Sequence, residues 1–457
     1  MTRPRCFLSA GIAVILVLTA CGAPRPTATP TPTITPIRIP TPTPTLAPAP
    51  RTTPTATYRV VVIWVRQFGS AVDDGAWAVA VDQVGNVYVA GSTQGAMEGQ
   101  TALGEADAFL GKYEPGGEEL WTRQFGSSGL DIVPSVAIDG QGNVYVAGHT
   151  AASLPGQLSA GGGDAFLRKY DPLGQKLWTR QFGSPRLDKA SALAVDFEGN
   201  VYVVGETEGA LKGHTSSGRV DAFLRKYNPE GLELWTRQFG SANADAASSI
   251  ALDQQLNIYV AGFTEGALPG QVNAGLVDAF LAKYDSQGRE VWTRQFGSRH
   301  LDLASGVAVD LEGNIFVAGG TLGVLDGQTT AGEGDAFVRR YNASGDELWT
   351  RQFGSPASDV ASSAAIDDEG NIYAAGMTLG GLPGNETAGE SDAFLRKYSP
   401  EGAELLTWQF GSVADDMARS VTVGAGGTVY LAGVTLGNLL DQFSLGGADA
   451  FLVRVRE

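Results

Sequence analysis

Residues 135–182 carry the sequence SVAIDGQGNVYVAGHTAASLPGQLSAGGGDAFLRKYDPLGQKLWTRQF, and this stretch decides the fold. Short segments of β-branched and aromatic residues alternate with Gly, Asn and Pro, as in strands joined by turns. The expected strands are residues 135–139, 143–148, 164–170 and 176–182. The sequence DGQGN between the first pair supplies Gly and Asn where a tight hairpin needs positive φ, so these strands should be antiparallel neighbours. In the last strand, Trp178, Arg180 and Phe182 should share one face.

The same unit recurs along the chain with a constant spacing. The motif Gln-Phe-Gly-Ser recurs every 57 residues, with its Phe at Phe68, Phe125, Phe182, Phe239, Phe296, Phe353 and Phe410. The motif Asp-Ala-Phe recurs at the same interval, with its Asp at Asp107, Asp164, Asp221, Asp278, Asp335, Asp392 and Asp449. A period of this length is typical of propellers, solenoids and arrays. With about four strands per unit, the sequence predicts an all-β, seven-bladed β-propeller with antiparallel blades.

The two ends of the repeat indicate how the ring closes. Residues 60–68 form a fourth strand with no earlier strands before it, and residues 448–455 form a third strand with no fourth after it. Pairing these strands would complete a blade and remove two exposed strand edges. A helical solenoid is excluded, because Gly or Pro interrupts every apolar period of helical length. A β-helix is disfavoured, since its coils need no hairpin signal in nearly every unit.

The repeated unit resembles the SBBP-type β-propeller repeat of bacterial exported and surface proteins. The resemblance rests on Asp-x-x-Gly-Asn-Val-Tyr-Val-Ala-Gly-x-Thr, Asp-Ala-Phe-Leu-x-Lys-Tyr and Trp-Thr-Arg-Gln-Phe-Gly, and it covers about residues 60–456. It implies a propeller fold and a cell-envelope location, and it supplies no general catalytic residues. Three local departures are Leu256 in place of the turn Gly, Gly424 in place of the first-strand Asp, and Trp408 in place of the fourth-strand Arg.

Residues 1–21 have the order of a secretory signal peptide, with Arg3 and Arg5 before an apolar run that ends in Leu-Thr-Ala-Cys at Cys21. This end resembles a bacterial lipobox, which implies that Cys21 is lipidated and becomes the mature N-terminus. Residues 22–57 are mostly Pro, Thr and Ala, which predicts a semi-extended spacer or, alternatively, a disordered tail without a spacing role. We therefore expect residues 58–457 to be the propeller of a monomeric, extracytoplasmic cell-envelope lipoprotein. Because Cys6 lies in the signal segment, no disulfide is expected in the propeller.

The propeller is strongly acidic. Five of the 32 basic residues and none of the 49 acidic residues lie in residues 1–57, which leaves 27 basic against 49 acidic side chains and a net charge of −22. Nucleic acid and anionic lipid head groups are therefore not expected as partners. The lipid anchor is the expected link to a membrane.

Residues that recur in every copy should be required by the blade itself, whereas a single ligand site should use positions that differ between copies. On this basis, the candidate ligand-binding residues of the loop face are His149, Glu206, Glu208, Arg219, Glu265, Arg299 and His300. The leading hypothesis is a non-enzymatic binding or scaffold module that presents these loops to a protein or glycan of the cell envelope.

Two alternatives remain open at this point. A multivalent lectin would use the repeated Trp-Thr-Arg-Gln strand, since Trp rings stack on sugars and Arg donates hydrogen bonds. The competing interpretation of that strand is packing between blades. A propeller lyase would instead use the loop-face histidines His149, His214 and His300, provided that they approach a shared pocket with a carboxylate. No phosphate-binding loop, serine hydrolase elbow or other catalytic motif is present.

A second repeated set of carboxylates offers calcium candidates. Asp residues lie six positions after each repeated Phe, at Asp74, Asp131, Asp188, Asp245, Asp302, Asp359 and Asp416. These carboxylates and nearby loop carbonyls could bind Ca²⁺, which takes only oxygen ligands. The competing interpretation is that each Asp caps loop N–H groups. EF-hand spacing is absent, and no other cofactor is expected.

Overall fold

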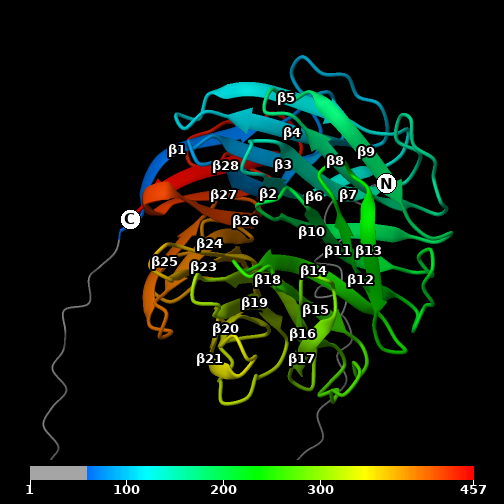
Figure 1. Ribbon diagram of the computed structural model, residues 1–457. Helices are drawn as coiled ribbons and strands as arrows, with labels where there is room; N and C mark the ends of the chain where they lie inside the picture. Colours follow the sequence, from blue (N-terminus) through cyan, green and yellow to red (C-terminus); the bar gives the residue numbers. More distant parts are fainter. Residues whose placement is uncertain (1–58) are drawn as a thin grey trace, which may run out of the picture. The chain divides into compact units, whose positions relative to one another are not determined.

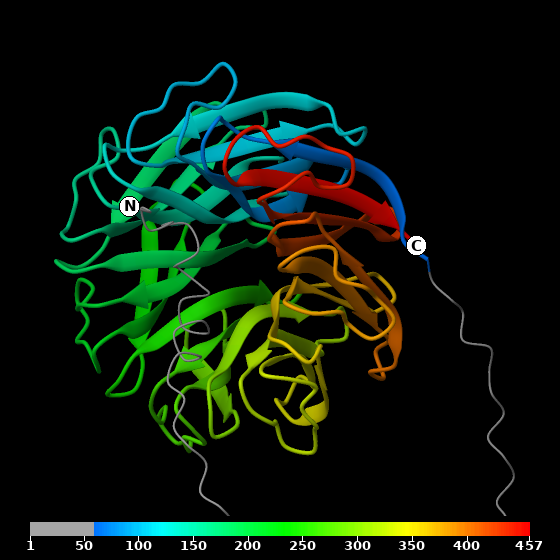
Figure 2. The same cartoon turned by 180° about the vertical axis from the view of Figure 1, so that it is seen from behind.

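The computed structural model describes residues 59–457, which form seven four-stranded antiparallel sheets arranged in a ring (Figures 1 and 2). In each complete blade the chain runs from the innermost strand outward and then crosses to the innermost strand of the next blade. The predicted signal segment, the spacer and Cys21 lie outside the described residues. Within residues 59–457, no helix is long and apolar enough to cross a membrane.

Each blade consists of four strands that lie one after another from the inside of the ring outward. The first three blades contain β2 (Asp74–Val81), β3 (Val87–Thr93), β4 (Asp107–Tyr113) and β5 (Glu119–Phe125); β6 (Asp131–Ile138), β7 (Val144–Thr150), β8 (Asp164–Tyr170) and β9 (Lys176–Phe182); and β10 (Asp188–Val195), β11 (Val201–Thr207), β12 (Asp221–Tyr227) and β13 (Glu233–Phe239). The next three contain β14 (Asp245–Leu252), β15 (Ile258–Thr264), β16 (Asp278–Tyr284) and β17 (Glu290–Phe296); β18 (Asp302–Val309), β19 (Ile315–Thr321), β20 (Asp335–Tyr341) and β21 (Glu347–Phe353); and β22 (Asp359–Ile366), β23 (Ile372–Thr378), β24 (Asp392–Tyr398) and β25 (Glu404–Phe410). Blade seven contains β26 (Asp416–Gly424), the short 3₁₀ turn η2 (Ala425–Gly427), β27 (Thr428–Thr435), β28 (Asp449–Arg456) and β1 (Val61–Phe68).

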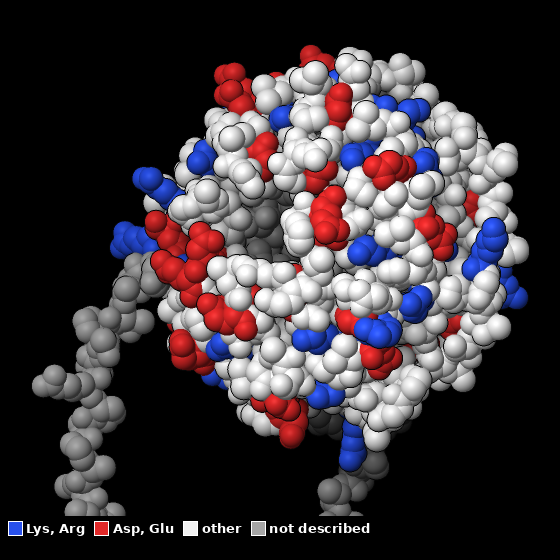
Figure 3. Space-filling view, in the orientation of Figure 1, with Lys and Arg blue, Asp and Glu red and all other residues white. Residues whose placement is uncertain are grey.

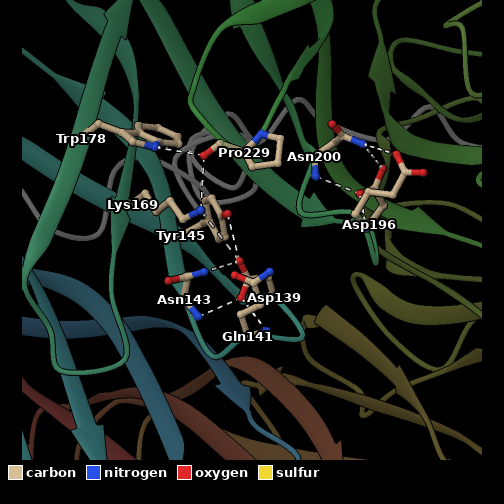
Figure 4. Close-up of polar contacts among 10 residues, drawn as sticks. Asp139, Gln141, Asn143, Tyr145, Lys169, Trp178, Asp196, Asn200 and Pro229 are labelled. Atoms are coloured by element: carbon tan, nitrogen blue, oxygen red, sulfur yellow. Dashed lines mark hydrogen bonds and ion pairs between the residues drawn. The ribbon is translucent and has the colours of Figure 1, made fainter.

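The Asp-x-x-Gly-Asn motif builds the hairpin between the two inner strands of a blade. In the second blade, the Asp139 carboxylate accepts hydrogen bonds from the backbone N–H groups of Gln141 (2.9 Å) and Asn143 (2.9 Å), as Figure 4 shows. The side-chain amide of Asn143 also donates to Asp139 (2.8 Å). Gly142 supplies the left-handed backbone that the turn needs, with φ of +80°. The hairpin predicted from the sequence is therefore confirmed.

The innermost strands are longer than the sequence pattern indicated. Strand β6 begins at Asp131, four residues before the expected start, and its register with β7 shifts between Ile132 and Ser135. Every innermost strand carries such a bulge near the same place. A bulge places an extra residue in one strand and breaks the alternation of side chains, so the pattern that predicts a strand stops there.

The hydrophobic core lies between neighbouring blades. The ring of Phe125 in β5 packs edge-on against Phe166 in β8 of the next blade, with centroids 6.0 Å apart, and also contacts Tyr170. Tyr145 is fully buried, and the same contacts recur around the ring. Because each sheet buries its two faces against its two neighbours, the repeated aromatic residues are packing residues, as expected.

The ring closes through the N-terminal strand. Strand β1 pairs antiparallel with β28, with Val65 opposite Val453 and Phe68 opposite Ala450. The side-chain amide of Gln67 donates to the Asp449 carboxylate (2.7 Å). Chain segments nearly 400 residues apart thus complete one blade, which Figure 1 shows as the blue and red strands lying side by side. The closure predicted from the phase of the repeat is confirmed.

Candidate binding surface

The repeated Trp-Thr-Arg-Gln strand joins neighbouring blades. In β9, Trp178 Nε1 donates to the carbonyl of Pro229 (3.2 Å), and Arg180 Nε donates to the carbonyl of Gly231 (2.7 Å). Both acceptors lie in the turn between β12 and β13 of the next blade. We call this pair of contacts the interblade latch. Both contacts of the latch recur in β1 and β21, and the arginine contact alone also recurs in β5, β13 and β17.

The latch favours the packing interpretation of this strand over the lectin hypothesis. Trp178 is half-buried, and a Cβ atom at Gly231 of the next blade would lie 3.0 Å from its ring. The Arg180 guanidinium is directed to carbonyl oxygens of that turn. A sugar would therefore have to compete with contacts that already join the blades.

A buried lysine completes this edge of the second blade. Lys169 Nζ donates to the same Pro229 carbonyl (3.3 Å), lies 4.9 Å from the centroid of the Tyr145 ring and is 4.0 Å from the Asp139 carboxylate (Figure 4). Burial lowers the pKa of Lys169, and the Asp139 and Glu230 carboxylates oppose that shift. The hairpin edge of the ring is thus occupied by structural contacts.

The opposite edge, which we call the loop face, carries the long loops between the second and third strands and the crossings between blades. Each of the calcium candidates is the first residue of an innermost strand, and all of them are buried. The Asp131 carboxylate accepts hydrogen bonds from the Ser127 N–H (2.6 Å) and the Ser127 hydroxyl (3.0 Å). Burial raises the pKa of Asp74 to about 6. These contacts are those of a loop cap.

A second carboxylate lies close to each capping Asp. The Asp107 carboxylate accepts from Gln124 Nε2 (2.7 Å) and from the Leu103 N–H (2.7 Å). A Cβ atom at Gly126 would lie 2.5 Å from one Asp107 oxygen and 2.7 Å from one Asp131 oxygen. The Gly of the Gln-Phe-Gly-Ser motif is therefore required where two buried carboxylates approach the backbone.

These carboxylates form pairs rather than larger clusters. Among residues 59–457, no group of three or more His, Cys, Asp or Glu side chains is placed to hold a metal ion. Calcium usually takes six to eight oxygen ligands. Calcium binding by the Asp74 set stays a prediction, whereas its capping role is visible in the hydrogen bonds.

The structure brings part of the predicted loop-face set together. Arg219 and Glu265, from the loops of the third and fourth blades, form an ion pair of 2.7 Å. Glu206 in β11 pairs with Lys189 in β10, also at 2.7 Å. We call Lys189, Glu206, Arg219 and Glu265 the polar sector.

The other predicted residues lie around this sector. Glu208, Arg299 and His300 are exposed on loops of the same face. The backbone carbonyl of His300 accepts hydrogen bonds from Leu276 (3.2 Å) and Val277 (3.3 Å), which fixes that loop. His149 lies on β7 in the second blade, half-buried, and burial together with the Lys189 charge lowers its pKa to about 4.

The histidines occupy three different elements, and no hydrogen bond within residues 59–457 joins one to another. His149 belongs to β7, His214 to the loop after β11, and His300 to the crossing before β18. No carboxylate appears among the groups that shift the pKa of His149. Lyase activity through these histidines stays a prediction.

Sequence reasoning found only His149 and Glu206 of a ring of variable residues on the inner strands. Near the loop face, one residue of the innermost strand lies opposite one residue of the second strand in each blade. These register partners are Gly75 and Ser92, Ile132 and His149, Lys189 and Glu206, Ala246 and Phe263, Leu303 and Gly320, Val360 and Met377, and Met417 and Val434. We call these pairs the variable ring. Comparing residues 57 positions apart inside the strands, and not in the loops alone, would have found it.

Seven closed four-stranded blades with a variable loop face define the class of protein, a seven-bladed β-propeller. The family model described as the SBBP beta-propeller repeat matches residues 63–96, 120–155, 177–211, 234–268, 291–326 and 348–383. The chain therefore belongs to the SBBP beta-propeller repeat family. Each match begins in the outermost strand of one blade and ends after the second strand of the next.

Similar proteins include both a curated relative and solved structures. Regulatory protein FlaEY of Caulobacter vibrioides is 26% identical over 434 residues, which cover 82% of this chain and 45% of the relative. The chain spans less than half the length of the curated relatives it matches. The Pan2 WD40 domain of Neurospora crassa has a TM-score of 0.49 and 9% identity, covering 86% of this chain and 95% of that one. A virginiamycin B lyase of Staphylococcus aureus has a TM-score of 0.47 and 10% identity, covering 85% and 98%.

Proposed function

We propose that this propeller is a non-enzymatic binding or scaffold module that engages a protein or glycan of the cell envelope through its loop face. The observation that carries the proposal is that repeated positions make structural contacts, whereas variable positions carry charges that differ between blades. The repeated residues make interblade latches and loop caps, whereas the charged residues of the polar sector differ from blade to blade.

The polar sector suits a specific contact. The Lys189–Glu206 pair lies within the third blade, and the Arg219–Glu265 pair joins the third blade to the fourth. Arg219 is largely exposed, with 68% of its side-chain surface accessible. Exposed pairs of this kind add little to stability, so their presence is better explained by recognition than by folding. Figure 3 shows acidic and basic side chains interspersed on one face of the ring, which is hollowed near its middle.

A charge-matched pair of variants tests this function. The loop-face variant replaces Lys189, Glu206, Arg219 and Glu265 with Ser, and the control replaces Lys176, Glu230, Arg289 and Glu312 with Ser on the hairpin edge. Both remove two positive and two negative charges. The full chain and both variants are compared for binding to a glycan panel and to purified cell-envelope proteins.

We expect a glycan or protein bound by the native chain to be lost in the loop-face variant and kept by the control. Equal binding by both variants, or no binding by the native chain, would contradict the proposal. Shortening of a bound glycan by the native chain would contradict the non-enzymatic part.

The proposal includes a lipid anchor at Cys21, supported by the lipobox-like sequence before it. The change Cys21→Ser should move the protein from the membrane fraction to the soluble fraction, because residues 22–457 contain no other cysteine for acylation. Cys6→Ser is the matched control and should leave the fraction unchanged. Detergent-phase partitioning that survives Cys21→Ser would contradict the anchor.

A further inference from the structure

One sector of the central channel differs from the rest of the ring. The innermost strands of neighbouring blades contact one another in a closed circle, and the bulge residue of each strand is half-buried there. These bulge residues are Trp77, Pro134, Ser191, Ser248, Ser305, Ser362 and Arg419. Five blades carry Pro or Ser, and the two exceptions stand next to each other, because β26 and β2 are neighbours across the closed ring.

Trp77 and Arg419 are fitted to each other and to their surroundings. The Arg419 guanidinium carbon lies 5.1 Å from the centroid of the Trp77 ring, and Trp77 Nε1 donates to the Ser92 hydroxyl (2.8 Å). A Cβ atom at Gly75 would lie 2.9 Å from the Trp77 ring, so the ring needs glycine there. The equivalent residues in other blades include Ile132 and Leu303, which would occupy this space.

The Arg419 side chain is half-buried and has no acidic partner among the described residues. Its Nε is buried without a hydrogen-bond partner, and its Nη2 contacts only the Met417 sulfur, at 3.5 Å. Burial lowers the pKa of Arg419 to about 10, with no carboxylate opposing the shift. By contrast, Arg180 and Arg219 direct their guanidinium groups to carbonyl or carboxylate oxygens. A partly desolvated charge that has only a ring and a thioether beside it is costly, and folding alone gives no reason to keep it.

Guanidinium groups bind carboxylate, sulfate and phosphate groups through paired N–H donors. We propose that Arg419 and Trp77 form a site at the loop-face mouth of the channel for the oxyanion of a small organic ligand, whose apolar part packs on the half-buried Trp77 ring. Figure 3 shows a hollow at the middle of the ring, where Figure 1 places β2 and β26 in the same orientation. The site lies in the first and seventh blades, whereas the polar sector lies in the third and fourth. It therefore does not depend on the function proposed for the polar sector.

The test uses the full chain with two probes, sulfate and glucuronate, at an ionic strength held constant with sodium chloride. Ligand binding to the folded state raises Tm with concentration. We expect a saturable rise in Tm of a few degrees and a saturable change in Trp fluorescence in the native protein. Arg419→Met should lose both responses, whereas Arg289→Met, the same change at an exposed arginine, should keep them.

Further variants separate binding from a structural role. Trp77→Phe should keep the rise in Tm but lose the fluorescence change, which assigns the signal to this site. Without added anions, Arg419→Met should have a Tm equal to or above that of the native chain, because it removes a half-buried charge that has no acidic partner. A response to both probes assigns the site to the oxyanion alone, and a response to glucuronate alone assigns it to a carboxylate on a sugar. The proposal would be overturned if sodium chloride alone gave the same response, or if Arg419→Met still responded to the probes. A Tm of Arg419→Met that lies several degrees below that of the native chain would also overturn it.

Discussion

Leu256 occupies a turn position between the first and second strands of the fourth blade, where the equivalent turns of the first six blades otherwise have glycine. Leu256 has φ of +61°, whereas its equivalent Gly199 has φ of +83°. A left-handed backbone costs a residue with a Cβ atom about 1–2 kcal/mol. Glycine avoids this cost, but it loses more conformational entropy on folding, which offsets part of the gain. Leu256→Gly should therefore stabilise the protein by about 0.5–1 kcal/mol, seen as a higher midpoint of denaturant unfolding. Gly199→Leu is the matched reverse change and should destabilise it; a stabilising Gly199→Leu would contradict the argument.

The buried capping carboxylates make stability depend on pH. Burial raises the pKa of Asp74 and Asp359 to about 6, from an ordinary value of 3.8, and the pKa values of Asp131, Asp188, Asp245, Asp302 and Asp416 are also raised. A carboxyl with a raised pKa binds its proton more tightly in the folded state. Its contribution to stability is full below the unfolded pKa and is lost as the pH rises through the folded value. Between pH 7 and pH 5, Tm should therefore rise by about 1–3 °C.

His149 opposes this trend. Its pKa is lowered to about 4, so its contribution is present above the unfolded value of 6.5 and is lost as the pH falls. One histidine acts against seven carboxyls, so the change of Tm with pH should keep the direction that the carboxyls set. Thermal unfolding at both pH values checks this, and the double change Asp74→Asn with Asp359→Asn should reduce the rise. A Tm that falls between pH 7 and pH 5 would show that the carboxyls stay ionised.

At the scale of single strands, the interblade latch explains a departure in the sequence. Strand β25 carries Leu406 and Trp408 where other blades have Trp and Arg. Among the described residues, it faces the one blade whose third and fourth strands, β28 and β1, are not joined by a turn. Trp408 stacks on Phe410 at 4.1 Å. Lys397 pairs with the Glu457 carboxylate (2.7 Å), whereas the equivalent Lys169 contacts a turn carbonyl. The latch residues change where their acceptors are missing.

The dependence of the latch on a facing turn gives a matched pair of predictions. Arg237→Met in β13 removes the hydrogen bonds to the carbonyls of Gly288 (2.7 Å) and Gln287 (2.9 Å), and it should destabilise the protein by about 1–3 kcal/mol. Trp408→Arg restores the repeated residue in β25 but should give no gain, because no turn faces it. Chemical denaturation of both variants measures the difference. A stabilising Trp408→Arg would mean that the arginine acts within its own blade.

Strands with regular alternation and glycine turns could be predicted from the sequence, because both signals recur in seven copies. The bulges could not, since an extra residue such as Pro134 breaks the alternation without leaving a turn signal. For the binding surface, the loop charges Arg219 and Glu265 were predicted, but not their pairing. Lys189 and Arg419 were missed because they lie inside innermost strands and the comparison of variable residues was made on the loop face, although both side chains are half-buried.

At the scale of the whole molecule, a ring of separate sheets depends on contacts between blades. Each core cluster contains residues of more than one blade, so no blade buries its faces alone. Six blades are continuous in sequence and one is assembled from both ends of the chain. The assembled blade is therefore the point at which the ring can open without breaking a continuous unit.

Removal of residues 58–69 should open the ring. It removes β1, with the Gln67 hydrogen bond to Asp449 (2.7 Å) and the Trp64 latch to the Pro115 carbonyl of the first blade (3.0 Å). It also leaves β28 as an exposed, mostly apolar edge, which favours association between chains. A chain that starts at residue 70 should therefore unfold less cooperatively, be larger in solution and associate with increasing concentration. A chain that starts at residue 58 keeps every contact described for β1 and should behave as one compact monomer. Thermal unfolding and light scattering of the two chains measure the difference, and identical behaviour would mean that β1 does not hold the ring closed.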